Sequence, residues 1–385
     1  MGRHVLQEAK GLIHTVTINR GRTYWEGDLI ATPPMSKVTG DRGDERSMTK
    51  AIAEVCRIHS GLCVGGVIPT VTVVDFSCDD KDEMRAVFVA LRELMPSQQG
   101  KVFVRSIHRY VLVSSDSVYA PTYISSGVTE DATLCSPASK GYSGEKLRGE
   151  MQLGRDVTAA IRDGLLGPSF QAIVFRLPDV LGPYDRSGRF WATVLWATSK
   201  VPMLLSPSCT PVRGQLLSFV SGVDVAKKVV QIATGVVPPT GRAIAAYNLA
   251  CPEQTTLVNF VRLVASEVHA QTGLDVAVRE SAPSSYDDSD SSSSDIIDSS
   301  DDEVDACSCD YYPSVRCGPL DLSLSTAELQ WAPTSLAMVV RGAVAFFLAA
   351  GSVDPARGIH GPFPAECRAA IKRLPTLVKL SLVSK

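Results

Sequence analysis

The fold is decided by the segment YVLVSSDSVY at residues 110–119 and, after a loop, by GYSGEK at residues 141–146. The first segment begins with the continuous apolar run of a buried β-strand and ends in serines. In the second segment Tyr142 and Lys146 are four residues apart, so on a helix they lie on the same face. Together the two segments predict a strand that ends in serines, followed by a helix that presents a Tyr–Lys pair.

These residue types suit proton transfer to and from a hydroxyl group. A tyrosine that acts as a base must work as a phenolate near neutral pH, so its pKa must fall from about 10 by roughly 3 units, or about 4 kcal/mol. A lysine ammonium one helical turn away supplies a field that favours the phenolate. A serine hydroxyl can hold the reacting oxygen through hydrogen bonds that strengthen as charge develops. The alternative is that Tyr142 and Lys146 are ordinary exposed helix residues, because Tyr-x-x-x-Lys is a short motif.

The arrangement resembles the active site of the extended short-chain dehydrogenase/reductase family, whose members include sugar-nucleotide epimerases and dehydratases. The resemblance implies that Tyr142 is the acid/base and that Lys146, with an oxidised nicotinamide, stabilises its phenolate. It implies that Ser115 steadies the reacting oxygen. Ser115 is selected over Ser114 because family members place this hydroxyl four positions before the tyrosine of a Val-Tyr pair, here Tyr119.

The beginning of the chain departs from this family. Residues 2–10 predict a helix and residues 13–18 a strand, whereas a dinucleotide-binding fold begins with a strand and a Gly-x-x-Gly-x-x-Gly turn that approaches the pyrophosphate. Gly2 resembles the third glycine of that turn. The sequence therefore predicts a Rossmann-like sheet that lacks its first strand, either because the chain is truncated within the motif or because the motif has been lost.

Other positions of the resemblance concern the cofactor. Asn19, Arg20 and Arg22 follow the family's second strand, where NAD-specific members place an acidic residue. Because an arginine there suits a 2′-phosphate, NADP is favoured over NAD, unless the two arginines are only surface charges. The resemblance adds further cofactor contacts, with the adenine or with the rest of the dinucleotide, from Asp41, Phe76, Ser77 and Pro178.

The substrate side of the site is implied by two further segments. Asp116 is a substrate-binding candidate. Dehydratases of the family follow the strand-end hydroxyl residue with Asp-Glu, whereas this chain has Asp116 followed by Ser117, so epimerisation or reduction is favoured over dehydration. Asp179 lies in a segment that resembles the family's Arg-Pro-x-x-Val-x-Gly-Pro motif and is implied to face the substrate. Arg186 and Arg189 suit a substrate diphosphate, or else form the solvated face of a helix.

Strands are predicted at residues 70–76, 110–113 and 170–176, and an amphipathic helix at residues 82–95. Alternating strands and helices predict a Rossmann-like doubly wound α/β fold, a parallel sheet with helices on both faces. We assign residues 1–176, with part of 212–250, to an NAD(P)-binding domain and residues 177–350 to a smaller substrate-binding α/β part. A strand-to-helix segment at residues 217–226 is expected to use Asp224 as its helix cap. Residues 351–385 form a C-terminal extension.

The composition describes a globular protein, since 385 residues with 45% apolar and 21% charged side chains can bury a full core. Charge is uneven along the chain. Residues 284–305 contain nine Asp or Glu and no Lys or Arg, and without them the formal net charge changes from −3 to +6. This Ser/Asp-rich insert buries too little apolar surface to offset its ordering entropy, so we expect it to be disordered.

Several classes of protein and site are disfavoured. Ten cysteines without regular spacing, and no signal peptide, favour reduced thiols in the cytoplasm. The one cysteine cluster, Cys307, Cys309 and Cys317, has no histidine near it, so no metal site is expected. The most apolar run, residues 336–351, is interrupted by Arg341 and is shorter than the ~20 residues of a membrane-spanning helix. No basic stretch is interleaved with aromatics, which disfavours a nucleic-acid partner.

The sequence thus predicts an NAD(P)-dependent epimerase or reductase that acts on a hydroxyl or keto group of a sugar nucleotide or related small molecule. A homodimer is compatible with this prediction. The alternative is a non-catalytic protein on the same scaffold that binds RNA or protein and has lost cofactor binding. The incomplete glycine turn supports this alternative, whereas the intact Tyr142, Lys146 and Ser115 oppose it.

Overall fold

The chain divides into two compact units. The first comprises Met1–Val180, Ser218–Gln254 and Cys317–Leu336, and the second comprises Leu181–Leu217, Thr255–Arg316 and Ala337–Lys385. The computed structural model describes residues 2–20, 35–121, 127–185, 187–199, 201–205, 214–237, 241–280, 317–350, 352–354 and 358–360. The Ser/Asp-rich insert lies outside the described residues, so its expected disorder stays a prediction.

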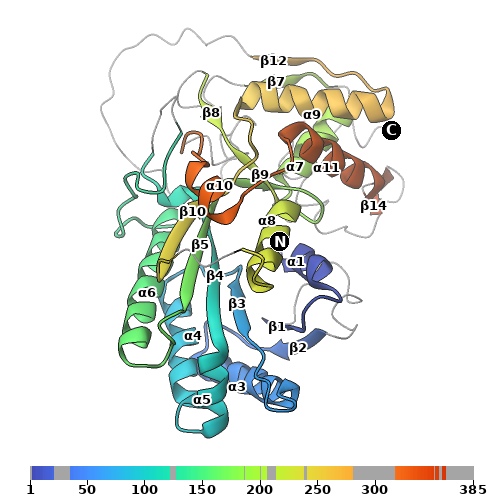
Figure 1. Cartoon of the computed structure of the whole chain (residues 1–385). Helices are drawn as coiled ribbons and strands as arrows, with labels where there is room; N and C mark the ends of the chain where they lie inside the picture. Colours follow the sequence, from blue (N-terminus) through green and yellow to red (C-terminus); the bar gives the residue numbers. More distant parts are fainter. Residues whose placement is uncertain are drawn as a thin grey trace. The chain divides into compact units, whose positions relative to one another are not determined.

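A four-stranded parallel sheet forms the centre of the first unit, in the order β10-β5-β4-β3 (Figure 1). Its strands are β3 (Val71–Asp75), β4 (Ile107–Ser115), β5 (Gln171–Leu177) and β10 (Ile244–Asn248). β4 and β5 pair over seven positions, ending with Ser115 opposite Leu177. The predicted strands at 70–76, 110–113 and 170–176 are therefore present, and their carboxyl ends lie at one edge of the sheet.

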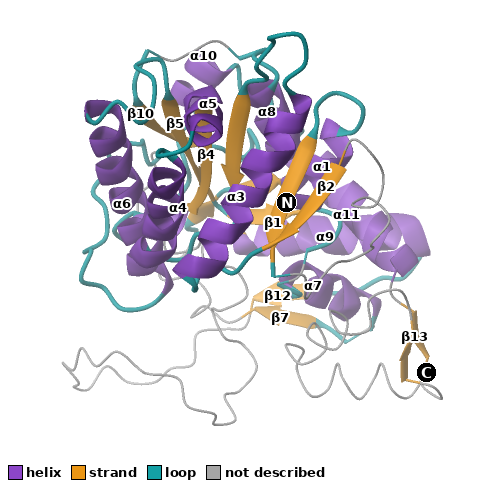
Figure 2. Cartoon of the chain, turned by 90° about the horizontal axis from the view of Figure 1, so that it is seen from below, coloured by secondary structure: helices purple, strands orange, loops and turns teal. Residues whose placement is uncertain are grey.

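Helices cover both faces of this sheet, because successive strand residues point to opposite sides. Tyr110 and Leu112 of β4 pack with α3 (Glu45–Leu62), α4 (Lys81–Leu94) and α6 (Tyr142–Arg162). Val111 and Val113 pack with α1 (Gly2–Ala9) and α8 (Gly222–Ala233) on the other face. Figure 2 shows these helices on either side of the strands. The predicted doubly wound arrangement is confirmed.

Two further strands of this unit form a separate parallel pair. β1 (Thr15–Asn19) pairs with β2 (Met35–Thr39), and within the described residues neither strand is hydrogen-bonded to the four-stranded sheet. All five residues of β1 and the first four of β3 are only half-buried, in contrast to β5, which is buried throughout. Among the described strands, the sheet is therefore interrupted between β1 and β3.

Two local features of the first unit differ from the sequence interpretation. No element was predicted between Met95 and Tyr110, but α5 (Gln98–Ser106) lies there, capped by Ser97, whose hydroxyl accepts a hydrogen bond from the Gly100 N–H. Asp224 was expected to cap α8, and this was wrong. Ser221 is the cap, and its hydroxyl accepts from the Asp224 N–H at 3.2 Å. The Asp224 carboxylate instead accepts hydrogen bonds from the backbone N–H and hydroxyl of Thr334.

The second unit is a smaller α/β assembly. Its helices are α7 (Arg189–Thr198), α9 (Leu257–Thr272) and α11 (Leu336–Ala350), and the rings of Phe190, Trp191 and Phe347 pack together in its interior. Short strand pairs complete it: β7 (Met203–Leu205) with β12 (Val278–Glu280), β8 (Leu216–Leu217) with β11 (Thr255–Thr256), and β13 (Ser352–Asp354) with β14 (Gly358–His360). Within the described ranges, no helix has the length and apolar character needed to cross a membrane.

Candidate active site

Ser115 is the last residue of β4 and lies at the carboxyl edge of the sheet. It is buried, and its hydroxyl accepts a hydrogen bond from the Ser117 N–H at 3.2 Å, which starts a short 3-10 helix over Asp116–Val118. The same hydroxyl donates to Asp116 Oδ1 at 3.3 Å. α6 packs against both β4 and this 3-10 turn, so the strand end with Ser115 lies beside the helix with the Tyr–Lys pair.

Tyr142 is the first residue of α6, and glycines fix the way the chain enters this helix. Gly141 has a φ of +79°, a conformation that side chains disfavour. A Cβ at Gly144 would lie 2.0 Å from the Ser139 carbonyl oxygen, so only glycine allows this close approach. The Tyr142 side chain is 56% exposed, which leaves its ring accessible to a ligand.

Lys146 is buried one turn further along α6, and its ammonium has three neighbours. Nζ donates to the Cys78 carbonyl oxygen at 2.6 Å and to Asp79 Oδ1 at 2.8 Å, and it lies 5.5 Å from the centre of the Tyr142 ring. Burial by itself would lower the pKa of Lys146, but the Tyr142 phenolate and the Asp79 carboxylate outweigh burial, so the pKa is raised. The lysine is thus held as a cation beside Tyr142.

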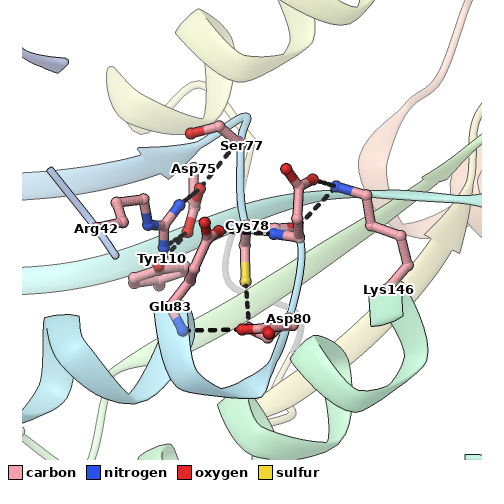
Figure 3. Close-up of polar contacts among 9 residues, drawn as sticks. Arg42, Asp75, Ser77, Cys78, Asp80, Glu83, Tyr110 and Lys146 are labelled. Carbon is pink, nitrogen blue, oxygen red and sulfur yellow. Dashed lines mark hydrogen bonds and ion pairs between the residues drawn. The ribbon is translucent and has the colours of Figure 1, made fainter. Parts of the chain in front are cut away.

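The segment after β3 that contacts Lys146 is anchored by a buried ion pair (Figure 3). Asp75, the last residue of β3, accepts hydrogen bonds from the Arg42 guanidinium, from the Tyr110 hydroxyl at 2.6 Å and from the Ser77 N–H at 3.1 Å. Burial alone would raise the pKa of Asp75, but Arg42, Tyr110 and Ser77 stabilise the carboxylate, so the pKa is lowered. Burial raises the pKa of the neighbouring Cys78 thiol to about 12, so this thiol is neutral.

A second buried polar network begins one turn after Lys146 on α6. Glu150, one turn after Lys146, forms an ion pair with Arg176 of β5 at 2.8 Å and accepts a hydrogen bond from the Ser114 hydroxyl. Arg176 also donates to the Tyr119 hydroxyl, which in turn donates to Asn248 Oδ1 at 2.7 Å. This network joins α6 to β4, β5 and β10, and it fixes the helix that presents Tyr142 and Lys146.

The predicted cofactor residues surround this edge only in part. A Cβ at Gly2 would lie 3.9 Å from Phe76 Cδ2, so the N-terminus of α1 lies against the end of β3, where a helix dipole can stabilise a pyrophosphate. Asp41 follows β2, and its carboxylate accepts a hydrogen bond from the Gly43 N–H. Lys146, the start of α1 and Asp41 all lie in the first unit, and their part in binding a dinucleotide stays a prediction.

The remaining predicted positions are dispersed. Asn19 ends β1 and Arg20 is exposed after it, Ser77 is exposed after β3, and Pro178 and Asp179 follow β5 at the same edge as Ser115. Asp116 is buried against Ser115. Arg189 begins α7 in the second unit. Arg22 and Arg186 lie outside the described residues.

Three residues of the site were missed by the sequence interpretation: Asp79, Glu150 and Arg176. Glu150 had a readable signal, because it lies eight residues after Tyr142 and four after Lys146, on the same face of one helix. Asp79 had none, because its contact with Lys146 joins residues 67 positions apart through the local path of a loop.

The sequence matches no protein-family model and no curated protein. The fold is nevertheless similar to that of solved enzymes. A UDP-glucose 4-epimerase from Thermotoga maritima, solved with UDP-glucose, is 15% identical over 90% of this chain and 95% of that one, with a TM-score of 0.56. A dTDP-glucose 4,6-dehydratase from Bacillus anthracis, solved with NAD, is 15% identical over 90% and 92%, with a TM-score of 0.58.

A third similar structure is the enzyme WbmH of Bordetella bronchiseptica in complex with NAD+, which is 17% identical over 90% of this chain and 94% of that chain, with a TM-score of 0.55. The two chains therefore correspond over nearly their whole lengths. At such identities the similarity establishes the fold alone: the chain has the architecture of these three enzymes, which is the fold that the resemblance implied.

Proposed function

We propose that this chain is an NAD(P)-dependent epimerase or reductase that acts on a hydroxyl or keto group of a nucleotide sugar. The observation that carries the proposal is the Tyr142–Lys146 pair, with the lysine Nζ 5.5 Å from the tyrosine ring at the carboxyl edge of the sheet. Ligands of open α/β sheets bind outside this edge. The fold shared with a UDP-glucose 4-epimerase and a dTDP-glucose 4,6-dehydratase supports the same substrate class.

Each of the three residues has one task in this proposal. The Tyr142 phenolate takes the proton from the substrate hydroxyl and returns it in the reverse step. The Lys146 ammonium stabilises the phenolate through its charge. The Ser115 hydroxyl, held by the Ser117 N–H, turns its O–H from Asp116 Oδ1 to the reacting oxygen and donates a hydrogen bond to it as negative charge develops.

A nicotinamide cofactor, when bound, supplies the hydride acceptor that such a reaction needs. In this proposal Lys146 and Asp41 hold the cofactor, and the N-terminus of α1, which lies against Phe76 at the end of β3, faces its pyrophosphate. Arg20 and Arg22, directly after β1 where an acidic residue would suit NAD, favour NADP, although two of the similar structures were solved with NAD+ or NAD.

The test is direct conversion of sugar nucleotides. The full chain is incubated with NAD or NADP and a panel of UDP- and dTDP-hexoses, and the products are separated by chromatography. We expect an epimer or a keto or reduced sugar to form with at least one substrate and one cofactor. If no sugar changes with either cofactor, under conditions in which a known UDP-glucose 4-epimerase converts its substrate, the proposal is wrong.

The second candidate is a non-catalytic binding protein on this scaffold. Two observations favour it: the sheet of the described residues is interrupted between β1 and β3, and the charge of Lys146 is shared with a carboxylate. The two candidates differ in one measurable respect. A binding protein would retain its interaction with its protein or RNA partner when Tyr142 is replaced by Phe, whereas the enzyme would lose turnover.

A further inference from the structure

We infer that Asp79, in the loop after β3, is a positioning residue of the proposed active site. Its carboxylate holds the Lys146 ammonium in place and reduces the positive field that this ammonium exerts at Tyr142. The inference rests on the proposed function for its catalytic consequence, but the ion pair itself can be tested without any substrate. Nothing in the Tyr-x-x-x-Lys or Ser motifs requires an acidic residue at this position.

The pair joins a buried ammonium to a carboxylate whose side chain is 65% exposed. Lys146 is 7% exposed, and its Nζ donates both to Asp79 Oδ1 at 2.8 Å and to the carbonyl oxygen of Cys78 at 2.6 Å. Two consecutive residues of one loop therefore hold the ammonium, Cys78 through its backbone carbonyl and Asp79 through its side-chain carboxylate. Figure 3 shows the Lys146 side chain extending from α6 toward the loop that carries Cys78 and Asp80.

The backbone of Asp79 is itself fixed. Its N–H donates to Glu83 Oε2 at 2.9 Å, and the adjacent Asp80 caps α4 by accepting hydrogen bonds from the N–H groups of Asp82 and Glu83. On the α6 side, a Cβ at Gly149 would lie 3.2 Å from Cys78 Sγ, so glycine allows the helix to approach this loop closely. The backbone that carries Asp79 and the helix that carries Lys146 are thus both fixed, and this brings the carboxylate within reach of the ammonium.

Other charged groups near Lys146 have partners of their own. Glu150 is paired with Arg176, and the Asp80 carboxylate accepts the capping N–H groups of α4. On the sheet side, Asp116 accepts from Ser115. Glu145 of the same helix is only half-buried. Asp79 is the one carboxylate with a hydrogen bond to Nζ among the described residues.

Two consequences follow from this contact. The Asp79 carboxylate favours the protonated form of Lys146, so Lys146 stays a cation to higher pH than burial alone would permit. The same negative charge opposes the field that the ammonium exerts at the Tyr142 ring. Removal of the charge should therefore let the amine lose its proton at lower pH and should favour the phenolate at lower pH. Both limbs of a pH–rate profile should therefore move to lower pH in the variant.

The test uses Asp79→Asn, which keeps an oxygen that can accept from Nζ but removes the charge. Competitive acylation of the full chain, followed by mass spectrometry of the peptide with Lys146, measures the reactivity of this amine as a function of pH. The plateau at high pH reports accessibility, and the midpoint reports protonation. We expect the midpoint to fall and the acylation rate at a fixed pH below it to rise several-fold. Asp82→Asn, which removes an exposed carboxylate three residues away in the first turn of α4, is the matched control and should change neither.

If Asp79→Asn leaves the midpoint of Lys146 acylation unchanged while circular dichroism shows an intact fold, the inference is wrong, whatever the catalytic activity. If turnover is detected, its pH optimum should move downward in Asp79→Asn and upward in Lys146→Met, because the first removes an anion and the second removes the cation. An optimum that moves upward in Asp79→Asn would overturn the inference while leaving the proposed function intact. A chain that shows the acylation shift but converts no sugar would refute the function alone.

Discussion

Lys146 supplies the positive charge beside the proposed acid/base, because its buried ammonium lies over the Tyr142 ring. We predict that Lys146→Met lowers turnover by ~10²-fold, since a preorganised cation is lost where negative charge develops. The pH optimum should move upward, because the phenolate loses its nearest cation. Methionine preserves most of the packing, so circular dichroism should show the wild-type fold. Unchanged turnover, with an unchanged pH optimum, would show that Lys146 has only a structural role.

Asp75 should make stability depend on pH. Its folded pKa is lowered, so the stability that it supplies is complete above the unfolded value of about 4 and is lost as the pH falls through the folded value. We predict that Asp75→Asn costs about 3 kcal/mol near neutral pH, because the buried Arg42 loses its counter-ion. Urea denaturation at several pH values should show a shallower acid loss in the variant than in the wild type. Equal slopes below pH 4 would contradict the assignment.

At the residue scale, the sequence predicted where side chains lie only when this is determined locally, and the catalytic roles of these side chains belong to the proposed function. Tyr142 and Lys146 were predictable because both are on one helix, and Ser115 because the resemblance places it at the strand end. Arg42, Asp75 and Asp79 were not, because their partners come from elements distant in sequence and are determined by how loops fold at the sheet edge. Asp224 shows the converse: its position after a strand suggested a cap, but a nearby serine, Ser221, fills that role.

At the scale of elements, α6 depends on a close backbone approach at its start. A Cβ at Gly144 would lie 2.0 Å from the Ser139 carbonyl oxygen, whereas a Cβ at Gly154 of the same helix would meet only Ile244 Cδ1 at 3.9 Å. We predict that Gly144→Ala destabilises the protein by about 1–3 kcal/mol, because the loop must move. Gly154→Ala should stabilise it by about 0.5–1 kcal/mol through helix propensity.

Chemical denaturation of the two glycine variants side by side provides the measurement. Equal effects of the two substitutions would show that the entry to α6 is not constrained by Ser139. Because Tyr142 and Lys146 are both in the first turns of this helix, Gly144→Ala should also reduce any turnover. Gly154→Ala, ten residues further along the same helix, should leave it unchanged.

The elements themselves could largely be predicted from apolar periodicity and resemblance. The strands of the central sheet and the amphipathic α4 are strongly patterned, and the structure contains them within a few residues of the expected bounds. α5 was missed because its nine residues include Gly100 and follow a proline, Pro96, which together suggest a loop. Its helical state depends on the Ser97 cap and on the burial of Phe103 and Val104.

At the scale of the whole molecule, the Ser/Asp-rich insert at residues 284–305 should be dispensable for folding. A segment with nine acidic residues and few apolar ones contributes little to a core. We predict that its deletion leaves the melting temperature nearly unchanged, as measured by calorimetry, and leaves the circular dichroism spectrum of the remaining chain the same. A large fall in melting temperature would show that the insert packs against the rest of the protein.

The most direct test of the central claim is the turnover of Tyr142→Phe, which removes only the phenolic oxygen. We predict a rate loss of ~10²–10⁴-fold with the best sugar nucleotide, because general acid–base catalysis is lost while packing is kept. Ser115→Ala should cost less than this, since it removes one hydrogen bond but not the proton path. Tyr247→Phe, which removes a hydroxyl bonded to Glu328 elsewhere in the same unit, is the matched control and should retain turnover. Wild-type turnover by a correctly folded Tyr142→Phe chain would show that Tyr142 is not the acid/base.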